Sequence, residues 1–179
     1  VGISMSLYHV FARLTPAAPD SLALRIITLA FSLVLAFFLF PARSGRATNR
    51  IPWTDLAFAG LSLVCTGYLF VRYEYVTSRF PTADPLSATD IAVAALAVVL
   101  VLEATRRTIG AALPIVAAVF ILYALVGPWL PAGLGHRGLT LEILLDQTFF
   151  TSEGIFGIPL GVAGSYVILF IIFGAFLEK

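Results

Sequence analysis

LALRIITLAFSLVLAFFLF, residues 22–40, decides the fold class of this chain of 179 residues. A bilayer core about 30 Å thick is crossed by roughly 20 apolar residues in a helix that rises about 1.5 Å per residue. The stretch has that length, and its one charge, Arg25, lies within a turn of its start and can extend to the lipid headgroups. It predicts a membrane-spanning helix.

Four further stretches meet the same length: residues 53–71, 89–105, 112–130 and 155–177. Ser87-Ala88-Thr89-Asp90 is typical of a helix N-terminus. The sequence therefore predicts an all-α integral membrane protein with five full transmembrane helices. Residues 1–14 are too short to span, and two interpretations stay open. They form either a truncated span or an interfacial amphipathic helix, since His9 and Arg13 fall four apart on one face.

Composition excludes several classes of protein. Hydrophobic residues make up 60% of the chain and charged residues 12%, and the mean hydropathy is +1.00, which is far from the globular average. The net charge of +1 and the single lysine, Lys179, provide no basic surface for nucleic acid. Cys65 is the only cysteine, so neither an intrachain disulfide nor a cysteine metal cluster is expected. We expect no metal site and no cofactor.

Arginines in the short loops predict the orientation. Residues 41–52 and the turn after the third span carry arginines with no acid between them, so both are expected in the cytoplasm. Residues 72–88 and 131–154 mix arginines with acids and are expected outside. The predicted cytoplasmic anchors are Arg43, Arg46, Arg50, Glu103, Arg106 and Arg107.

The middles of the five predicted spans carry no charge, which argues against a proton relay or an intramembrane protease within them. Ser165 has no histidine near it in the sequence, so serine catalysis is not expected and the chain is not predicted to be an enzyme. Glu103 precedes Arg106 and Arg107 by three and four residues. These residues either form ion pairs along one helix face or simply anchor the helix end.

Small residues in the last predicted span have the spacing that lets helices approach closely. Close packing is the favoured interpretation, and an ion site built from carbonyls freed by Pro159 is the alternative. The candidates are Gly157, Gly161, Gly164 and Ser165.

The segment 139–150 predicts an amphipathic helix on the outer surface, with leucines on one face and acids on another. The acids predicted to face a partner are Glu142, Asp146 and Glu153.

Three stretches carry a resemblance to a known family: LEATRRTIG (residues 102–110), ALPIVAAVFILYALVGPWLP (residues 112–131) and TSEGIFGIPLGVAGSYVILFIIFGAFLEK (residues 151–179). They resemble the N-terminal part of fused permeases of the tripartite ATP-independent periplasmic (TRAP) transporters. SLYHVFARL and the span ending in FLFPA extend the likeness over nearly the whole chain. In these permeases a small membrane subunit is joined to a large transport subunit.

The resemblance implies a sodium-coupled importer of small organic acids in the bacterial inner membrane, supplied by a periplasmic solute-binding protein of the TAXI class. It implies that residues 1–130 are small-subunit-like, that 131–154 form a periplasmic connector, and that 155–179 begin the large subunit. It also favours a truncated first span at residues 1–14. Substrate and sodium would bind mainly to later helices of the large subunit, so the chain is expected to be a fragment. The alternative is a stand-alone multi-pass membrane assembly or anchoring protein.

Overall fold

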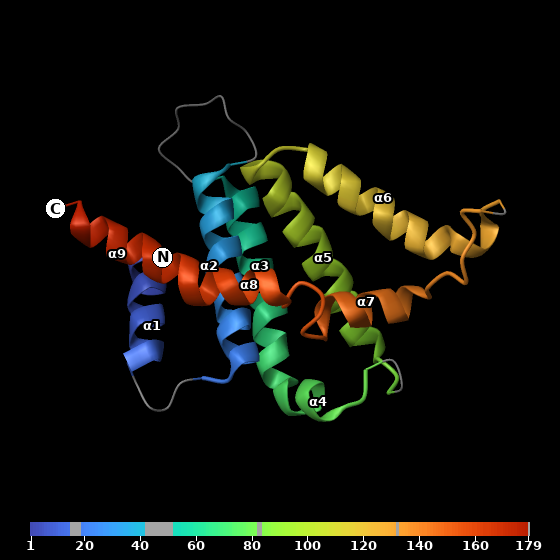
Figure 1. The fold of residues 1–179 in the computed structure, drawn as a ribbon, viewed down its shortest axis with the longest axis horizontal. Coiled ribbons are helices and arrows are strands. Elements are labelled where there is room, and N and C mark those ends of the chain that lie inside the picture. Colours follow the sequence, from blue (N-terminus) through green and yellow to red (C-terminus); the bar gives the residue numbers. More distant parts are fainter. Residues whose placement is uncertain (15–18, 42–51, 82–83, 132, 179) are drawn as a thin grey trace.

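The structure is a computed structural model that describes residues 1–14, 19–41, 52–81, 84–131 and 133–178. The predicted anchors Arg43, Arg46 and Arg50 lie outside these residues. The described residues form helices and no β-strand (Figure 1). The helices are α1 (Gly2–Leu14), α2 (Ser21–Leu39), α3 (Trp53–Val71), α4 (Tyr73–Ser78), α5 (Ala88–Thr108), α6 (Ala112–Val126), the 3-10 turn η1 (Gly127–Trp129), α7 (Leu141–Phe149), α8 (Ile158–Val162), the π-helical turn η2 (Ala163–Val167) and α9 (Ile168–Leu177).

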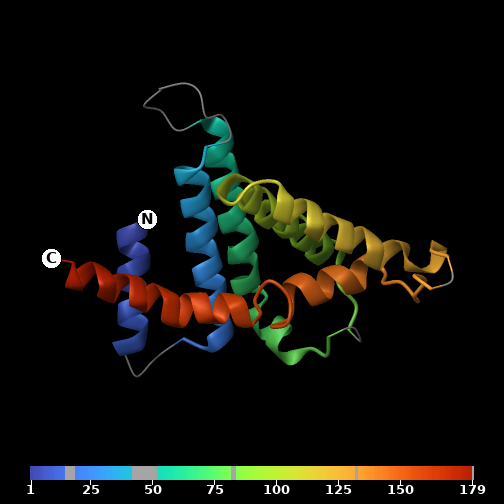
Figure 2. The ribbon, with the colours of Figure 1, turned by 45° about the horizontal axis from the view of Figure 1, so that its top comes forward.

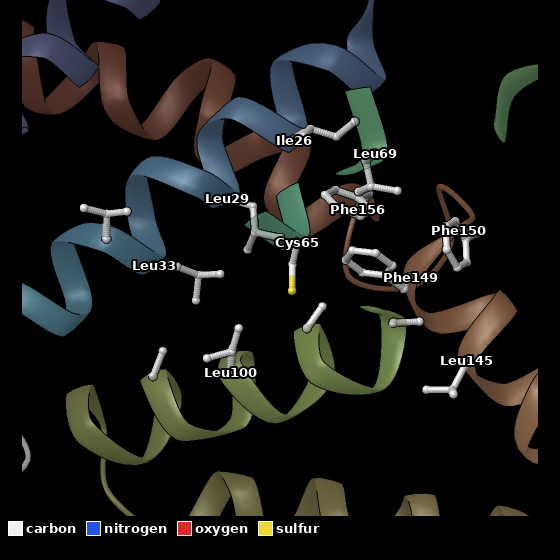
Figure 3. Packing of buried hydrophobic residues seen from close by; sticks show 14 of the residues in the cluster. Ile26, Leu29, Leu33, Cys65, Leu69, Leu100, Leu145, Phe149, Phe150 and Phe156 are labelled. Atoms are coloured by element: carbon white, nitrogen blue, oxygen red, sulfur yellow. The ribbon is translucent and has the colours of Figure 1, made fainter. Parts of the chain in front are cut away.

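A bundle of three long helices, α2, α3 and α5, forms the centre of the molecule, and α7 packs against α5 (Figures 1 and 2). Every third or fourth residue of α2 points into this bundle, through Ile26, Leu29, Leu33 and Phe37. The facing residues of α5 are mostly alanines, which bring its backbone close to its neighbours. Figure 3 shows Ile26, Leu29 and Leu33 of α2 beside Cys65 and Leu69 of α3, with the phenylalanines at the end of α7 and after it close by.

Ser62 and Thr66 are the polar residues on the buried stripe in the middle of α3. Their hydroxyls donate to the carbonyl oxygens of Phe58 and Ser62, each at 2.8 Å. Each hydroxyl is thereby satisfied within its own helix, and the interior of the bundle stays neutral.

Within the described residues, five helices are long and apolar enough to span a membrane. The span at 53–71 coincides with α3, and the others shift by a few residues at their ends. The last one begins at Ile158 rather than at residue 155. Pro159 therefore lies in the first turn of α8, where its missing N–H disturbs no helical bond. The alternative interpretation, in which Pro159 frees carbonyls inside the helix, does not match this position, and the irregular turn of the helix is η2.

Two of the five helices lie at the margin of the molecule. α6 turns back beside α5 after Gly110, whose φ of 105° ends α5 in the left-handed conformation that glycine adopts without strain. α8, η2 and α9 lie across α2 rather than along it, in both ribbon views (Figures 1 and 2). A membrane crossing by this last helix therefore stays a prediction from its length and composition.

α1 stands beside α2, and the axes of the two helices are roughly aligned in both views. His9 is buried between them, with Nε2 3.0 Å from Thr28 Oγ1 and Nδ1 2.8 Å from the carbonyl oxygen of Met5. The interfacial interpretation placed His9 on a polar surface face, and this placement is wrong. The histidine belongs to a contact between two helices.

Candidate functional site: charged clusters at the ends of the helix bundle

The Asp55 cluster joins the start of α3 to the end of α5 and consists of Asp55, Glu103, Arg106 and Arg107. Glu103 accepts hydrogen bonds from Nε of Arg106 and Nε of Arg107, each at 2.7 Å. Nη1 of Arg107 donates to Asp55 Oδ1, also at 2.7 Å. Of the two interpretations left open by the sequence, the structure has the ion pairs along one face of α5, and Arg107 extends them to a second helix.

The two arginines of this cluster differ in their surroundings. The side chain of Arg106 is 51% exposed, whereas that of Arg107 is 3% exposed. The guanidinium of Arg107 lies over the rings of Phe37 and Phe58, about 5 Å from each centroid. Two carboxylates and two aromatic faces thus compensate the cost of burying this cation. Arg106 lies at the surface, where its anchoring role stays a prediction, whereas Arg107 is an internal cross-link.

The Asp90 cluster lies at the other end of the same helices and consists of Tyr68, Arg72, Ser87 and Asp90. Ser87 caps α5: its Oγ accepts from the backbone N–H of Asp90, and its own N–H donates to Asp90 Oδ2. This confirms the N-terminus predicted from the sequence. Asp90 also accepts from the hydroxyl of Tyr68 at 2.8 Å and from Nη2 of Arg72 at 3.0 Å. A fully buried carboxylate therefore fixes α3 to α5.

One hydrogen bond beside the Asp90 cluster reaches the residue that precedes α2. The hydroxyl of Tyr73 donates to Asp20 Oδ2 at 2.6 Å, and Asp20 precedes α2. This bond and that from the Ser21 N–H lower the pKa of Asp20. Burial, followed by the bond to Asp20, raises the pKa of Tyr73 to about 12. The hydrogen bond of Arg72 to Asp90 raises the pKa of the Arg72 guanidinium.

A buried ion pair joins Arg79, which follows α4, to Asp146 of α7. Nη2 of Arg79 donates to Asp146 Oδ1, and the rings of Tyr75 and Phe150 flank the guanidinium. Asp146 is 2% exposed, so the prediction that it faces a partner across the surface is wrong. Leu144, Leu145 and Phe149 bury one side of α7. That burial brings Asp146 within reach of Arg79.

The other two predicted partner-facing acids are exposed. Oε1 of Glu142 accepts from the backbone N–H of Leu86 at 3.0 Å and holds the segment before α5. Glu153 is exposed in the turn before α8. A partner at these two acids stays a prediction.

The small residues of the last helix play different roles. A Cβ atom on Gly164 would lie 2.5 Å from Thr28 Oγ1, and one on Gly161 would lie 3.0 Å from Nε of Arg25. These two glycines permit the crossing with α2. Gly157 faces its own preceding turn, and Ser165 donates to the carbonyl oxygen of Gly161 at 2.6 Å.

The charged clusters are separated by about the thickness of a membrane interior. Asp55 and Arg72 lie 17 positions apart along α3, as do Asp90 and Arg107 along α5, which corresponds to about 26 Å of helix. A hydrocarbon core measures about 30 Å. The bundle thus presents an uncharged middle section between two polar ends, and its ionisable groups form structural cross-links.

The sequence indicated only part of these clusters. The pairing of Glu103 with Arg106 and Arg107 follows from their spacing, but Asp55 and Arg107 are 52 positions apart. The predicted orientation placed both residues at the cytoplasmic ends of neighbouring spans. Their pairing could have been predicted from that placement. Arg79 carried no comparable signal, because only the packing of α7 places Asp146 beside it.

In the part of the chain that the structure describes, no group of three or more His, Cys, Asp or Glu side chains is placed to hold a metal ion. Comparison of the chain with protein-family models, curated proteins and solved structures finds no match. A function for the chain therefore rests on its own residues and geometry.

Proposed function

We propose that this chain is the membrane-embedded supporting part of a TRAP-type transporter. The proposed transporter imports small carboxylates with sodium and receives them from a periplasmic solute-binding protein. The observation that carries the supporting role is the pairing of charges at both ends of the bundle, with an uncharged section between them. Such an arrangement suits a rigid scaffold, because the charges in these clusters are paired with one another. The proposal takes the transporter class from the motifs at residues 102–110, 112–131 and 151–179.

In the proposed orientation, the Asp55 cluster lies at the cytoplasmic side of the bacterial inner membrane and the Arg79–Asp146 pair at the periplasmic side. Glu142 and Glu153 are then available to the binding protein. α1 follows the direction of α2, which supports the truncated-span interpretation of residues 1–14 over the interfacial one.

α6 and α9 support the proposal through the apolar side chains that they expose all around. Phe120, Phe170 and Ile171 are examples, each exposed by more than half. A helix that is apolar on every side needs lipid or protein around it. In the proposed assembly, lipid covers part of this surface and the remainder of the large permease subunit covers the rest.

Uptake into proteoliposomes tests the proposal. Permease protein that joins this segment to the large subunit is reconstituted with the binding protein and offered a panel of radiolabelled small carboxylates. We expect uptake with an inward sodium gradient, and none with an equal potassium gradient or without the binding protein.

The same assay examines the stand-alone alternative. The 179-residue segment alone should give no uptake, and sodium-driven uptake by it would contradict a purely supporting role. If the segment neither copurifies with a large subunit nor is required for its uptake, the assembly or anchoring role replaces the proposal.

A further inference from the structure

An open cleft of about 270 Å³ lies where the last helix crosses α2. Arg25 and Ser21 of α2 and Ser165 and Tyr166 of η2 contribute its polar groups. Its apolar lining comes from Leu24, Ile158, Leu160 and Val162. A pocket with a cationic group and an apolar wall fits a ligand that has an anionic head and a hydrocarbon tail.

Arg25 differs from the arginines of the charged clusters. Arg72, Arg79, Arg106 and Arg107 each pair with a carboxylate. The guanidinium of Arg25 instead donates from Nη1 to the carbonyl oxygen of Phe156 at 2.6 Å. Among the described residues, no carboxylate lies within ion-pair distance of it. Its positive charge is therefore uncompensated in the part of the chain that the structure describes.

The other edge of the guanidinium, formed by Nε and Nη2, lies beside Gly161. A Cβ atom at that position would come within 3.0 Å of Nε and 3.1 Å of Nη2. Glycine leaves room for the guanidinium here, and both Arg25 and Gly161 line the cleft. Two parallel N–H groups are the arrangement that binds a phosphate or carboxylate through two hydrogen bonds.

The position of Arg25 along α2 further limits the kind of ligand that the cleft can bind. α2 begins at Ser21, so Arg25 lies about 6 Å along the helix from its start. In an inserted bundle, this position is at the level of the lipid headgroups. We infer that the cleft binds an anionic phospholipid, with its phosphate on Arg25 and an acyl chain along the apolar wall. The inference rests on the membrane insertion of the proposed function and does not depend on transport.

The lining of the cleft favours an anionic over a zwitterionic lipid. Among the residues that the structure describes, no acid lines the cleft, so the ammonium group of phosphatidylethanolamine would find no carboxylate from them there. The residues of the lining that carry hydroxyl groups are Ser21, Ser165 and Tyr166. Phosphatidylglycerol, whose head carries one negative charge and hydroxyl groups, matches this lining better.

Native mass spectrometry of the full chain, released from detergent with added lipid, tests the site. Wild-type protein should retain phosphatidylglycerol in preference to phosphatidylethanolamine. Arg25→Gln should weaken phosphatidylglycerol binding about tenfold, as expected for a lost charge-assisted contact. Arg137→Gln is the matched control, because it removes the same charge from an exposed loop position. It should change binding less than twofold.

Arg25→Lys keeps the positive charge but cannot form two parallel hydrogen bonds to one phosphate. It replaces Arg25→Gln in the test if that variant does not fold. It should bind phosphatidylglycerol several-fold more weakly than wild type. Equal affinity of wild type and either Arg25 variant would overturn the inference, as would equal retention of the two lipids. Competition by millimolar inorganic phosphate would assign the site to a soluble anion instead. Loss of uptake with lipid binding intact would count against the transport proposal alone.

Discussion

The three central helices and the two marginal ones are similarly apolar, yet they differ in how much of their surface is buried inside the molecule. Within the apolar 18-residue stretch of each helix, 33% of the residues in α2 and α3 and 28% of those in α5 are buried inside the molecule, against 6% for the α6 and α8–α9 segments. Charged cross-links join the ends of α3 to those of α5, whereas α6 and α9 contain no charged residue. Hydrophobicity therefore identifies a helix suited to a membrane, and paired polar groups identify the helices that are fixed to one another.

The largest expected effect is at Arg107. Arg107→Ala leaves Asp55 buried without its partner, and this should lower the free energy of unfolding by about 3–5 kcal/mol. The neighbouring Arg106 pairs at the surface with Glu103, which Arg107 also contacts. Arg106→Ala should therefore lower the free energy of unfolding by only about 0–1 kcal/mol. Equilibrium unfolding in mixed micelles measures both. Equal losses would show that the internal cross-link contributes no more than the surface pair.

A second prediction compares two leucines from the two classes of helix. Leu33 of α2 is 6% exposed and Leu122 of α6 is 59% exposed. Leu33→Ala should leave a cavity and cost about 2–5 kcal/mol. Leu122→Ala should change the stability of the isolated chain by less than about 0.5 kcal/mol. A large loss at Leu122 would place α6 within the folded core.

The crossing of the last helix over α2 supplies the third prediction. Gly164→Ala forces a methyl group toward Thr28 and should cost about 1–3 kcal/mol. Gly174 lies in the same helix with no neighbouring atom within 4 Å of an added Cβ. Gly174→Ala should stabilise the helix by up to about 1 kcal/mol. If both variants gain stability, the helix does not cross α2 at Gly164.

The smallest effect concerns the exposed bond between Tyr73 and Asp20. The folded state raises the pKa of Tyr73 to about 12, so the folded protein holds this proton more tightly than the unfolded chain. The stabilisation is fully present below pH 10, the ordinary tyrosine value, and is lost as the pH rises toward 12. The pKa of Asp20 is lowered, so its contribution is lost only in acid, as the pH falls through that depressed value.

Phenolate absorbance measured against pH checks this bond. Tyr73→Phe should remove a late-titrating tyrosine, whereas Tyr166→Phe, at an exposed position, should leave that step in place. A titration unchanged by Tyr73→Phe would mean that the bond to Asp20 does not form in solution.

Features that depend on residues close together in the sequence were predicted well. Length and apolar composition gave the five long segments, and residues 53–71 match α3 at both ends. The cap at Ser87 and the pairs of Glu103 also followed from neighbours in the sequence. Each depends on residues within about one helical turn, which the sequence shows directly.

The missed features depend on how helices pack. The burial of Asp146 depends on Arg79, 67 positions earlier, and the burial of His9 on Thr28 of another helix. The direction of the last helix depends on Gly161 and Gly164 meeting α2. A helix that is apolar on every side has the same composition whatever its crossing angle with a neighbour. Composition therefore does not predict the direction of the last helix.

The most direct test of the central claim asks whether the two ends of the bundle lie on opposite sides of a membrane. In a Cys65→Ser background, single cysteines replace Phe80 and Ile109, which are 75% and 70% exposed and lie near opposite ends of the bundle. An impermeant thiol reagent applied to intact spheroplasts should label Phe80→Cys at once and Ile109→Cys only after permeabilisation. Equal labelling of both in intact cells would contradict a membrane-spanning bundle.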